Sequence, residues 1–347
     1  MRAVTITPGA PGSLRLLTDF PEPSTDDGAV LVETLAVGIC GTDYEIISGN
    51  YGEAAPGTDT LVLGHESLGR VIEDPTGTLQ PGDLVAGIVR HPDPVPCPNC
   101  AVDEWDMCRN GQYTEHGIKG RQGFARDRWR IHPKFAVGLD PSLAEVGVLL
   151  EPASVVAKAW DHIDRIGKRA EWRPQTVLVT GAGPIGLLAA LLGSQRGLDV
   201  HVLDRNVSGP KPTLAGALGA HYHTNTVPEL DFEPDIVIEC TGAPTVVLDV
   251  IDKVGANGIV CLTGVSSGAR TLDLDAAALA RSLVLENNIV FGSVNANRRH
   301  WELAAEALTR ADTNWLASLI TRRLPVEAYA EAYTSNGGIK TVIEFAL

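Results

Sequence analysis

The stretch Thr180-Gly181-Ala182-Gly183-Pro184-Ile185-Gly186 decides the fold, because it carries the pattern Gly-x-Gly-x-x-Gly between a predicted strand and a predicted helix. The strand is expected over the apolar residues 176–180 and the helix over residues 184–196. The three glycines permit, in order, a tight turn, close approach of the backbone to a diphosphate, and close helix–strand packing. The diphosphate would lie at the helix N-terminus, where free N–H groups and the helix dipole favour an anion. The sequence therefore predicts a dinucleotide-binding domain.

Strand and helix patterns alternate around this motif. A helix is expected between residues 151 and 173, and apolar runs predict buried strands at 199–204, 235–240, 258–263 and 289–294. Such alternation is typical of a doubly wound parallel sheet. Before residue 141 the chain instead shows short β-rich runs broken by Gly and Pro, at 29–37, 61–63, 69–72 and 84–89.

The expected fold class is therefore α/β, with two domains. A β-rich catalytic domain is predicted over residues 1–156, and a Rossmann domain over residues 157–296. Residues 297–347 are expected to return to the first domain, with a helix near 301–310 and a strand near 341–345.

The composition excludes several classes of protein. The 347 residues include 43 acidic and 28 basic side chains, a net charge of −15, which argues against nucleic acid as a partner. The most apolar stretch, 185–193, is too short to cross a bilayer, and residues 1–16 lack the apolar core of a signal peptide. Six cysteines are too few for a disulfide scaffold, so their clustering suggests metal binding in the reducing cytoplasm.

Asp204 follows the glycine motif by 18 residues, where a carboxylate can accept hydrogen bonds from the ribose of NAD and would repel a 2′-phosphate. Arg205 could instead accept that phosphate, so NADP remains an alternative. Further along, Cys240-Thr241-Gly242 and Gly264-Val265 end predicted strands and are expected to flank the nicotinamide, although ordinary strand-terminal turns account for them equally well.

Potential metal ligands occur in three separate places: Cys40-Gly41-Thr42-Asp43, Gly64-His65-Glu66 and Glu151-Pro152. Thiolate, imidazole and carboxylate hold catalytic zinc while leaving one position open. Taken singly, a cysteine in an apolar run is usually a core residue, and a His-Glu pair usually belongs to a hydrogen-bonded surface or turn, so spacing alone favours these interpretations over a zinc site.

A second cluster, Cys97-x2-Cys100-x7-Cys108, lies in a Pro-rich loop over about residues 90–110. Three thiolates at this spacing indicate a structural zinc site, which needs a fourth ligand. Asp93, His91 and Asp103 are the candidates, and three reduced, metal-free cysteines are the alternative.

Together these motifs resemble the zinc-dependent medium-chain dehydrogenases. Gly38-x-Cys40-Gly41-Thr42-Asp43, Gly64-His65-Glu66, the cysteine loop, Glu151-Pro152 and the glycine motif occur in that family's order over almost the whole chain. Within the family, the chain is similar to the glucose 1-dehydrogenase branch. This similarity rests on motifs that are less specific than the zinc motifs, namely Ser48-Gly49-Asn50-Tyr51-Gly52, Tyr113-Thr114-Glu115-His116-Gly117-Ile118 and Val294-Asn295.

The resemblance implies a GroES-like catalytic domain and a role for each matching residue. It makes Cys40, His65, Glu66 and Glu151 ligands of the catalytic zinc. The first of the family's four structural cysteines corresponds here to Pro94, so the zinc of the loop is either held by a neighbour such as Asp93, beside Cys97, Cys100 and Cys108, or absent. Thr42 would relay the substrate proton, and Glu115, Glu151 and Asn295 would contact sugar. The cofactor would be bound by Gly181, Gly183, Pro184, Ile185, Gly186, Asp204, Arg205, Thr241, Gly264, Val265 and Asn295.

The expected reaction is oxidation of an aldose, D-glucose or a close analogue, at C1 to the lactone, with zinc as Lewis acid and NAD(P) as hydride acceptor. Three positions depart from the family pattern. Pro94 stands where the family has a structural cysteine, and Val155 stands where it often has a polar residue that contacts sugar. Glu45 stands where alcohol dehydrogenases often have a relay histidine. The alternatives are a zinc-dependent polyol or secondary-alcohol dehydrogenase and a non-catalytic nucleotide-binding regulator. The resemblance also implies a homo-oligomer, a tetramer or dimer joined through Rossmann sheet edges.

Overall fold

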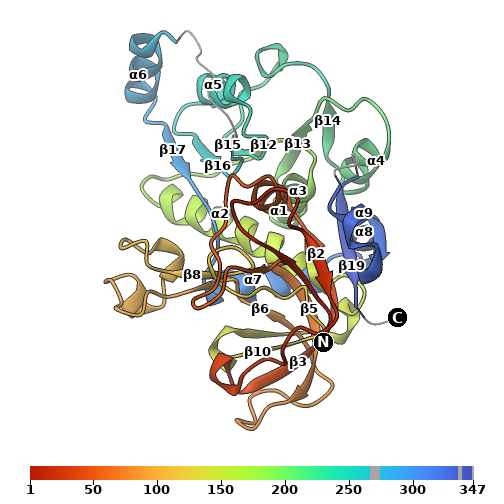
Figure 1. Ribbon diagram of the computed structural model, residues 1–347. Helices are drawn as coiled ribbons and strands as arrows, with labels where there is room; N and C mark the ends of the chain where they lie inside the picture. Colours follow the sequence, from red (N-terminus) through yellow and green to blue (C-terminus); the bar gives the residue numbers. More distant parts are fainter. Residues whose placement is uncertain (266–273, 335–337, 346–347) are drawn as a thin grey trace. The chain divides into compact units, whose positions relative to one another are not determined.

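The computed structural model describes residues 1–265, 274–334 and 338–345 (Figure 1). The chain forms two compact units. The first contains residues 1–154 and 295–347, and the second contains residues 155–294. The helix α2 (Leu150–Gly167) crosses the boundary between them.

The first unit is built around a seven-stranded sheet with the order β11-β6-β5-β3-β19-β18, in which β10 also pairs with β3. Its longest strand, β3, is antiparallel to both β5 and β19, so the last strand of the chain lies beside an early one. The strands are β3 (Val30–Ile39), β5 (Glu66–Glu73), β6 (Leu84–Gly87), β10 (Arg128–Ile131), β11 (Ala136–Leu139), β18 (Ile320–Pro325) and β19 (Lys340–Glu344).

This sheet brings three distant segments to one end. Gly38 of β3 pairs with Glu66 at the start of β5, and Ile39 pairs with Thr341 of β19. Because β5 and β19 both run antiparallel to β3, the residue that follows β3 meets the first residues of its two neighbours. Cys40, Glu66 and Lys340 therefore lie at the same end of the sheet, where β3 ends and β5 and β19 begin.

Two small sheets and four α-helices, together with the first turn of α2, complete the described part of the first unit. The sheet orders are β2-β1-β4 and β7-β8-β9. Their strands are β1 (Ala3–Ile6), β2 (Arg15–Leu17), β4 (Leu61–Val62), β7 (Arg90–His91), β8 (Thr114–His116) and β9 (Gly120–Arg121). The helices are α1 (Gly41–Ile47), the first turn of α2, α7 (Arg298–Thr309), α8 (Thr313–Leu319) and α9 (Tyr329–Ala332).

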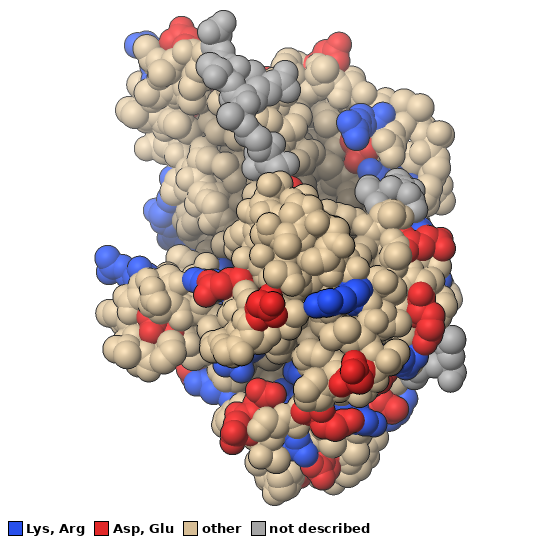
Figure 2. Space-filling view, viewed as in Figure 1, with Lys and Arg blue, Asp and Glu red and all other residues tan. Residues whose placement is uncertain are grey.

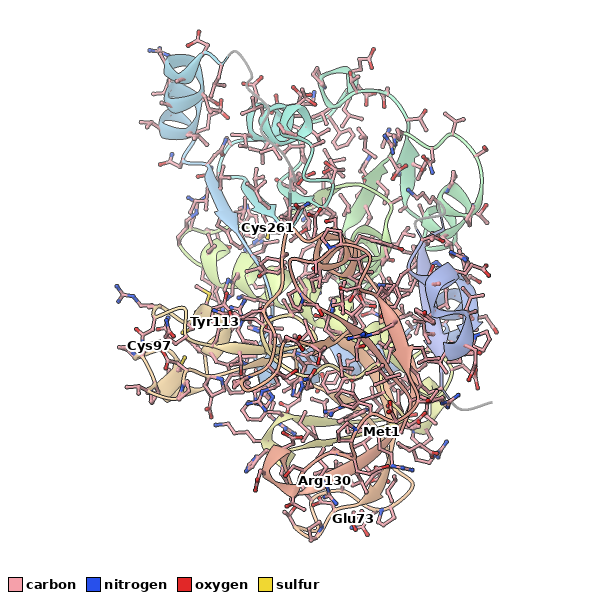
Figure 3. All side chains as sticks on the ribbon, in the orientation of Figure 1. Met1, Glu73, Cys97, Tyr113, Arg130 and Cys261 are labelled. Carbon is pink, nitrogen blue, oxygen red and sulfur yellow. The ribbon has the colours of Figure 1, made fainter. Side chains whose placement is uncertain are left out.

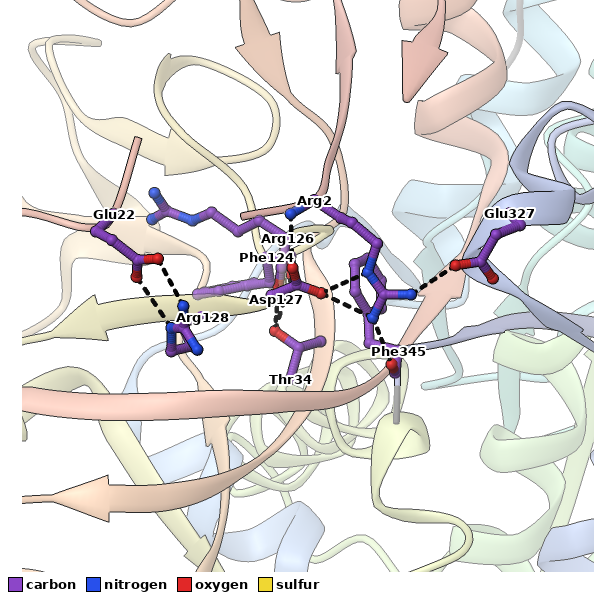
Figure 4. A network of polar contacts seen from close by, with 9 residues as sticks. All are labelled: Arg2, Glu22, Thr34, Phe124, Arg126, Asp127, Arg128, Glu327 and Phe345. Carbon is purple, nitrogen blue, oxygen red and sulfur yellow. Dashed lines mark hydrogen bonds and ion pairs between the residues drawn. The ribbon is translucent and has the colours of Figure 1, made fainter. Parts of the chain in front are cut away.

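A polar network fastens the two ends of the chain to this unit (Figure 4). The Arg2 guanidinium donates to Asp127 Oδ1 at 2.9 Å and to the Phe345 carbonyl oxygen at 2.8 Å. Thr34 of β3 donates to the Arg126 carbonyl oxygen, next to Asp127. An ion pair between Arg2 and Glu327 also forms, but the Glu327 side chain is 58% exposed, so the pair adds little stability.

The second unit is a six-stranded parallel sheet with the order β14-β13-β12-β15-β16-β17. The strand order reverses between β12 and β15, which is where dinucleotide-binding sheets open a crevice. The strands are β12 (Thr176–Thr180), β13 (Asp199–Leu203), β14 (His221–His223), β15 (Ile236–Glu239), β16 (Ile259–Leu262) and β17 (Ile289–Gly292). The helices besides α2 are α3 (Pro184–Gln195), α4 (Pro210–Ala217), α5 (Pro244–Lys253) and α6 (Ala276–Leu285).

The predicted strands of the second unit are confirmed, because buried strands read as apolar runs. Leu178, Val237 and Val260 from three neighbouring strands are fully buried against Val250 of α5. The helix predicted up to residue 173 is shorter, since α2 ends at Gly167. The strand β14 was not predicted, because its sequence His-Tyr-His is not an apolar run.

Charged side chains of both signs are interspersed on the face of the surface drawn in Figure 2. Within the described part of the chain, none of the helices combines the length and the apolarity that a membrane crossing requires.

Candidate active site

Three of the predicted metal ligands lie at the end of the sheet where β3 stops. Cys40 follows β3, and His65 and Glu66 lie at the start of β5. Cys40 Sγ lies 2.9 Å from His65 Nε2, and the ligand atoms of all three residues are within 4.8 Å of one another. The sheet register thus brings together donors that are 25 residues apart in sequence.

The first turn of α1 fixes Cys40 in position. Cys40 is the N-cap of this helix, and its Sγ accepts the Thr42 N–H at 3.3 Å. In return, Asp43 Oδ2 accepts the Cys40 N–H at 2.9 Å, which completes a capping box. Thr42 is half-buried beside the thiol, where the sequence analysis expected a proton relay.

Asp43 also lies beside the imidazole of His65. Its Oδ1 lies 3.7 Å from His65 Nδ1, and neither atom has a hydrogen-bond partner among the described residues. Burial lowers the pKa of His65, but the charges of Cys40 and Asp43 outweigh it and raise that pKa well above its usual value. Burial raises the pKa of Asp43. A carboxylate on the Nδ1 side leaves Nε2 as the metal-binding atom.

Glu66 has a buried partner that the sequence analysis missed. Lys340 Nζ donates to both Glu66 carboxylate oxygens, at 2.6 and 2.7 Å, and to the Ile39 carbonyl oxygen at 3.0 Å. Burial lowers the pKa of Lys340, but Glu66 and Cys40 raise it overall, so the amine stays charged. A lone lysine in an apolar terminal strand was the available signal.

Glu151 lies in the first turn of α2, outside the group of three close ligands within the described chain. Burial raises the pKa of its carboxyl to about 7; His65 opposes this shift and Glu66 adds to it. Glu151 therefore shares the electrostatic environment of the cluster without being in its closest shell.

The residues present fit a zinc ion. One thiol sulfur, one imidazole nitrogen and one carboxylate converge, and each is a donor type that catalytic zinc accepts. The buried Nδ1 of His65, which has no hydrogen-bond partner in the described part of the chain, lies 3.7 Å from Asp43 Oδ1, on the side where zinc-binding histidines commonly have a carboxylate.

The three cysteines predicted to bind a structural zinc ion, Cys97, Cys100 and Cys108, lie together in a separate lobe of the first unit (Figure 3, with Cys97 labelled). The ligand atoms of Cys97, Cys100 and Cys108 lie within 4.8 Å of one another. Hydrogen bonds from the backbone of Arg109 and Cys100 lower the pKa of Cys97 to about 6, whereas burial raises that of Cys100 to about 11. A thiol with a lowered pKa is more readily a thiolate, which is the form that binds metal.

Asp93 lies beside these thiols but, among the described residues, is not in their close group. Its Oδ1 accepts the Val95 N–H at 2.8 Å, and its buried Oδ2 has no hydrogen-bond partner in the described chain. Of the other two candidates, Asp103 pairs with Lys134. The His91 ring stacks on Phe135, and its buried Nε2 also has no hydrogen-bond partner among the described residues, but His91 is likewise outside the close group of thiols there.

Glu115 and Asn295, which are 180 residues apart, meet in the first unit. Glu115 Oε1 accepts from Asn295 Nδ2 at 2.9 Å and from Arg90 Nε at 3.0 Å. Two residues after Glu115, a Cβ at Gly117 would lie 2.5 Å from the Gly64 carbonyl oxygen, so this loop packs directly beside the segment that carries His65.

The glycine motif of the second unit has the geometry that its sequence predicts. Gly181 has a φ of +89°, and a Cβ at Gly186 would lie 1.7 Å from the Gly181 carbonyl oxygen. Gly183 is the N-cap of α3, and a Cβ there would meet nothing within 4 Å. The space above Gly183 is therefore open, as close approach of a diphosphate requires. Pro184 and Ile185 form the first turn of α3.

Asp204 is tied to this motif. Its Oδ2 accepts the Ala182 N–H at 2.8 Å and Lys211 Nζ at 3.0 Å, and its Oδ1 accepts the Asn206 N–H at 2.9 Å. Burial raises the pKa of Asp204, but these bonds lower it overall. Arg205, the next residue, is exposed.

Glu239, at the end of β15, is a further residue that the sequence analysis missed. It is fully buried, and its Oε1 accepts the N–H groups of Thr241 at 2.7 Å and Gly242 at 3.1 Å. A Cβ at Gly264 would lie 2.1 Å from the Gly242 nitrogen, so the two predicted nicotinamide loops touch, while Val265 is 86% exposed. The signal was an acidic residue closing an apolar strand.

Comparison with known proteins covers both units. The family described as "Glucose dehydrogenase C-terminus" matches residues 144–345, and the "Alcohol dehydrogenase GroES-like domain" matches residues 26–140. Glucose 1-dehydrogenase 2 of Vulcanisaeta moutnovskia is 41% identical over 352 residues, and glucose 1-dehydrogenase of Methanocella arvoryzae is 37% identical over 357 residues, with 99% of each chain covered.

Solved structures agree with these matches. Haloferax mediterranei glucose dehydrogenase in complex with NADP, Zn and gluconolactone superposes with a TM-score of 0.91 at 32% identity, covering 100% of both chains. Galactitol-1-phosphate dehydrogenase from Escherichia coli shares the fold, with a TM-score of 0.80 at 24% identity over 99% of this chain and 100% of that one. The chain therefore belongs to the zinc-dependent medium-chain dehydrogenase family, in its glucose 1-dehydrogenase branch.

Proposed function

We propose that this protein is a zinc-dependent dehydrogenase that oxidises D-glucose, or a close aldose, at C1 to the lactone and transfers the hydride to NAD(P). The observation that carries the proposal is the close group of half-buried Cys40 and buried His65 and Glu66, in a chain that is similar to glucose 1-dehydrogenases over its full length.

Each residue of the site has a proposed task. A zinc ion, when bound, supplies Lewis-acid stabilisation of negative charge on the substrate oxygen. Cys40, His65 and Glu66 would hold it, with Glu151 beside them. The Thr42 hydroxyl, fixed in the first turn of α1, would receive the proton of the sugar C1 hydroxyl and pass it outward.

The pair of Glu115 and Asn295 is proposed to bind sugar hydroxyls. Both described bonds to the Glu115 carboxylate use Oε1, so Oε2 can accept from a hydroxyl. A site built from such fixed polar groups penalises substrates that lack the matching hydroxyl.

For the cofactor, the sequence favours NAD with NADP as the alternative, and Lys211 makes the alternative stronger. Its ammonium group pairs with Asp204 and offsets the carboxylate charge that would repel a 2′-phosphate. Thr241, Gly264 and Val265 are proposed to line the nicotinamide side.

The three thiols of the lobe are proposed to bind a structural zinc ion with Asp93 as fourth ligand. The support is the buried Asp93 Oδ2, which has no hydrogen-bond partner among the described residues, on a residue whose backbone hydrogen-bonds to Cys100. Reduced metal-binding thiols also support a cytoplasmic location.

Assembly into a dimer or tetramer is likewise a proposal. The strand β17 pairs with β16 alone among the described strands, and Val284 and Leu285 at the end of α6 are 74% and 64% exposed. A free sheet edge beside exposed apolar side chains is suited to pairing with a second copy.

The deciding experiment follows nicotinamide reduction with D-glucose, D-galactose, D-xylose and sorbitol, each with NAD and with NADP. Aldose turnover that disappears in Cys40→Ala, with cofactor binding retained, is the expected result. Activity on sorbitol alone would move the protein to the polyol dehydrogenases. Full turnover by Cys40→Ala would refute the zinc mechanism, and binding of cofactor without turnover of any substrate would favour the regulator.

A further inference from the structure

Three imidazoles and a carboxylate gather at the edge of the parallel sheet in the second unit. The strands β13 and β14 run parallel, with His201 opposite His221 and Leu203 opposite His223. Side chains alternate between the two faces of a strand, and opposed residues share a face. Asp199 and His201 of β13 therefore lie on the same face as His221 and His223 of β14.

The Asp199 carboxylate bridges two of these imidazoles. His201 Nε2 lies 3.3 Å from Asp199 Oδ2, and His221 Nε2 lies 3.4 Å from Asp199 Oδ1. Zinc binds nitrogen and oxygen at about 2.0–2.2 Å, so two ligands of a tetrahedral ion are separated by about 3.3–3.6 Å. Both observed separations fall within this range, and the ligand atoms of Asp199, His201 and His221 all lie within 4.8 Å of one another.

The fourth polar group holds the central imidazole in place. His201 Nδ1 lies 2.8 Å from His223 Nε2, and the His201 ring packs on Phe232 with 3.9 Å between the centroids. Metal-binding histidines commonly use their second ring nitrogen for such an orienting hydrogen bond. The His221 and Asp199 side chains are 62% and 54% exposed, so an ion can reach the site from solvent.

We propose that Asp199, His201 and His221 form a binding site for a divalent transition-metal ion of the zinc type, with His223 as the positioning residue for His201. The ion would join β14, a three-residue strand that pairs only with β13 in the described sheet, to its neighbour. The strand β14 is also connected to the proposed cofactor site, because the His223 carbonyl oxygen accepts the Asp204 N–H at 3.1 Å. The proposal does not depend on the function proposed above.

The test measures the zinc content of the full-length protein after equilibration with buffered Zn²⁺. We expect the wild type to retain one more zinc ion per chain than His221→Gln. His132→Gln, which changes an exposed imidazole of the first unit, is the matched control and should keep the wild-type content. His223→Gln should retain the site with a zinc affinity about 10- to 100-fold weaker, since it removes only the orienting bond.

Circular dichroism checks that each variant is folded, and dehydrogenase activity of His221→Gln should equal that of the wild type. Asp199→Asn, at an exposed strand start, replaces His221→Gln if the latter does not fold. Equal zinc content in the wild type and in either folded variant would overturn the proposal. If the Cys40 site or the cysteine lobe binds no zinc, the wild type and His221→Gln lack that ion alike, and the difference of one ion per chain between them remains. Failure of the proposed function is therefore distinguishable from failure of this proposal.

Discussion

The buried ion pair between Lys340 and Glu66 stabilises the end of the sheet that carries the candidate active site of the first unit. Both side chains are 2% exposed, and three hydrogen bonds leave the ammonium group fully used. Removing one partner of such a pair leaves an uncompensated buried charge, which costs far more than the net worth of the pair. At the scale of single residues, Lys340 therefore stabilises the buried Glu66 carboxylate of the candidate site.

We expect Lys340→Met to lower the free energy of unfolding by about 3–5 kcal/mol, because Glu66 would remain buried without a counter-charge. The measurement is urea unfolding of the metal-free protein, in which no zinc ion can replace the lost charge. The matched control is Lys134→Met, whose pair with Asp103 is 42% and 61% exposed and should cost less than about 1 kcal/mol. Equal losses in the two variants would contradict this account of Glu66.

At the scale of elements, the turn between β12 and α3 separates a folding requirement from a binding requirement. A Cβ at Gly186 would collide with the Gly181 carbonyl oxygen at 1.7 Å, whereas a Cβ at Gly183 would enter open space. Gly186 is therefore required for the chain to fold at this turn, and Gly183 leaves room for a ligand, in line with the different roles that the motif predicts for them.

Gly186→Ala should destabilise the second unit and lower the thermal midpoint by several degrees. Gly183→Ala should leave that midpoint within about 1 °C of the wild type, since the N-cap φ of −81° suits any residue. It should nevertheless weaken NADH or NADPH binding at least tenfold, because the methyl group occupies the approach path of the diphosphate. Fluorescence titration of the reduced cofactor measures this. Unchanged affinity in Gly183→Ala would place the diphosphate elsewhere.

The cysteine lobe gives a second prediction at this scale. Cys108→Ser should reduce the zinc content by one ion per chain while the Cys40 site keeps its zinc, because the two groups of ligands lie in separate segments. Metal analysis, with Cys261→Ser as a control in a buried strand of the second unit, checks this. An unchanged zinc content in Cys108→Ser would mean that the three thiols are reduced and metal-free.

At the scale of the whole molecule, the sequence predicted those parts whose pattern is local. The strand β12 and the helix α3 follow from apolar runs around one glycine motif, and both were predicted almost to the residue. Lys340 could not be predicted as the partner of Glu66, which is 274 residues away in sequence. Spacing alone left the zinc site open for the same reason, since the sheet register and not the sequence distance joins Cys40 to His65.

Acid stability of the molecule should depend on two buried histidines of the first unit, His91 and His116. Burial lowers the pKa of both rings well below the usual value, and Arg121 adds to the shift. The unfolded chain takes up these protons below about pH 6.5 while the folded chain does not, so the free energy of unfolding falls on acidification by about 1.4 kcal/mol per pH unit for each ring. Urea unfolding at pH 7.5, 6.5 and 5.5 measures the slope. His116→Gln should remove its share of the decline between pH 6.5 and 5.5, and an unaltered decline in that variant would show that other groups control acid unfolding.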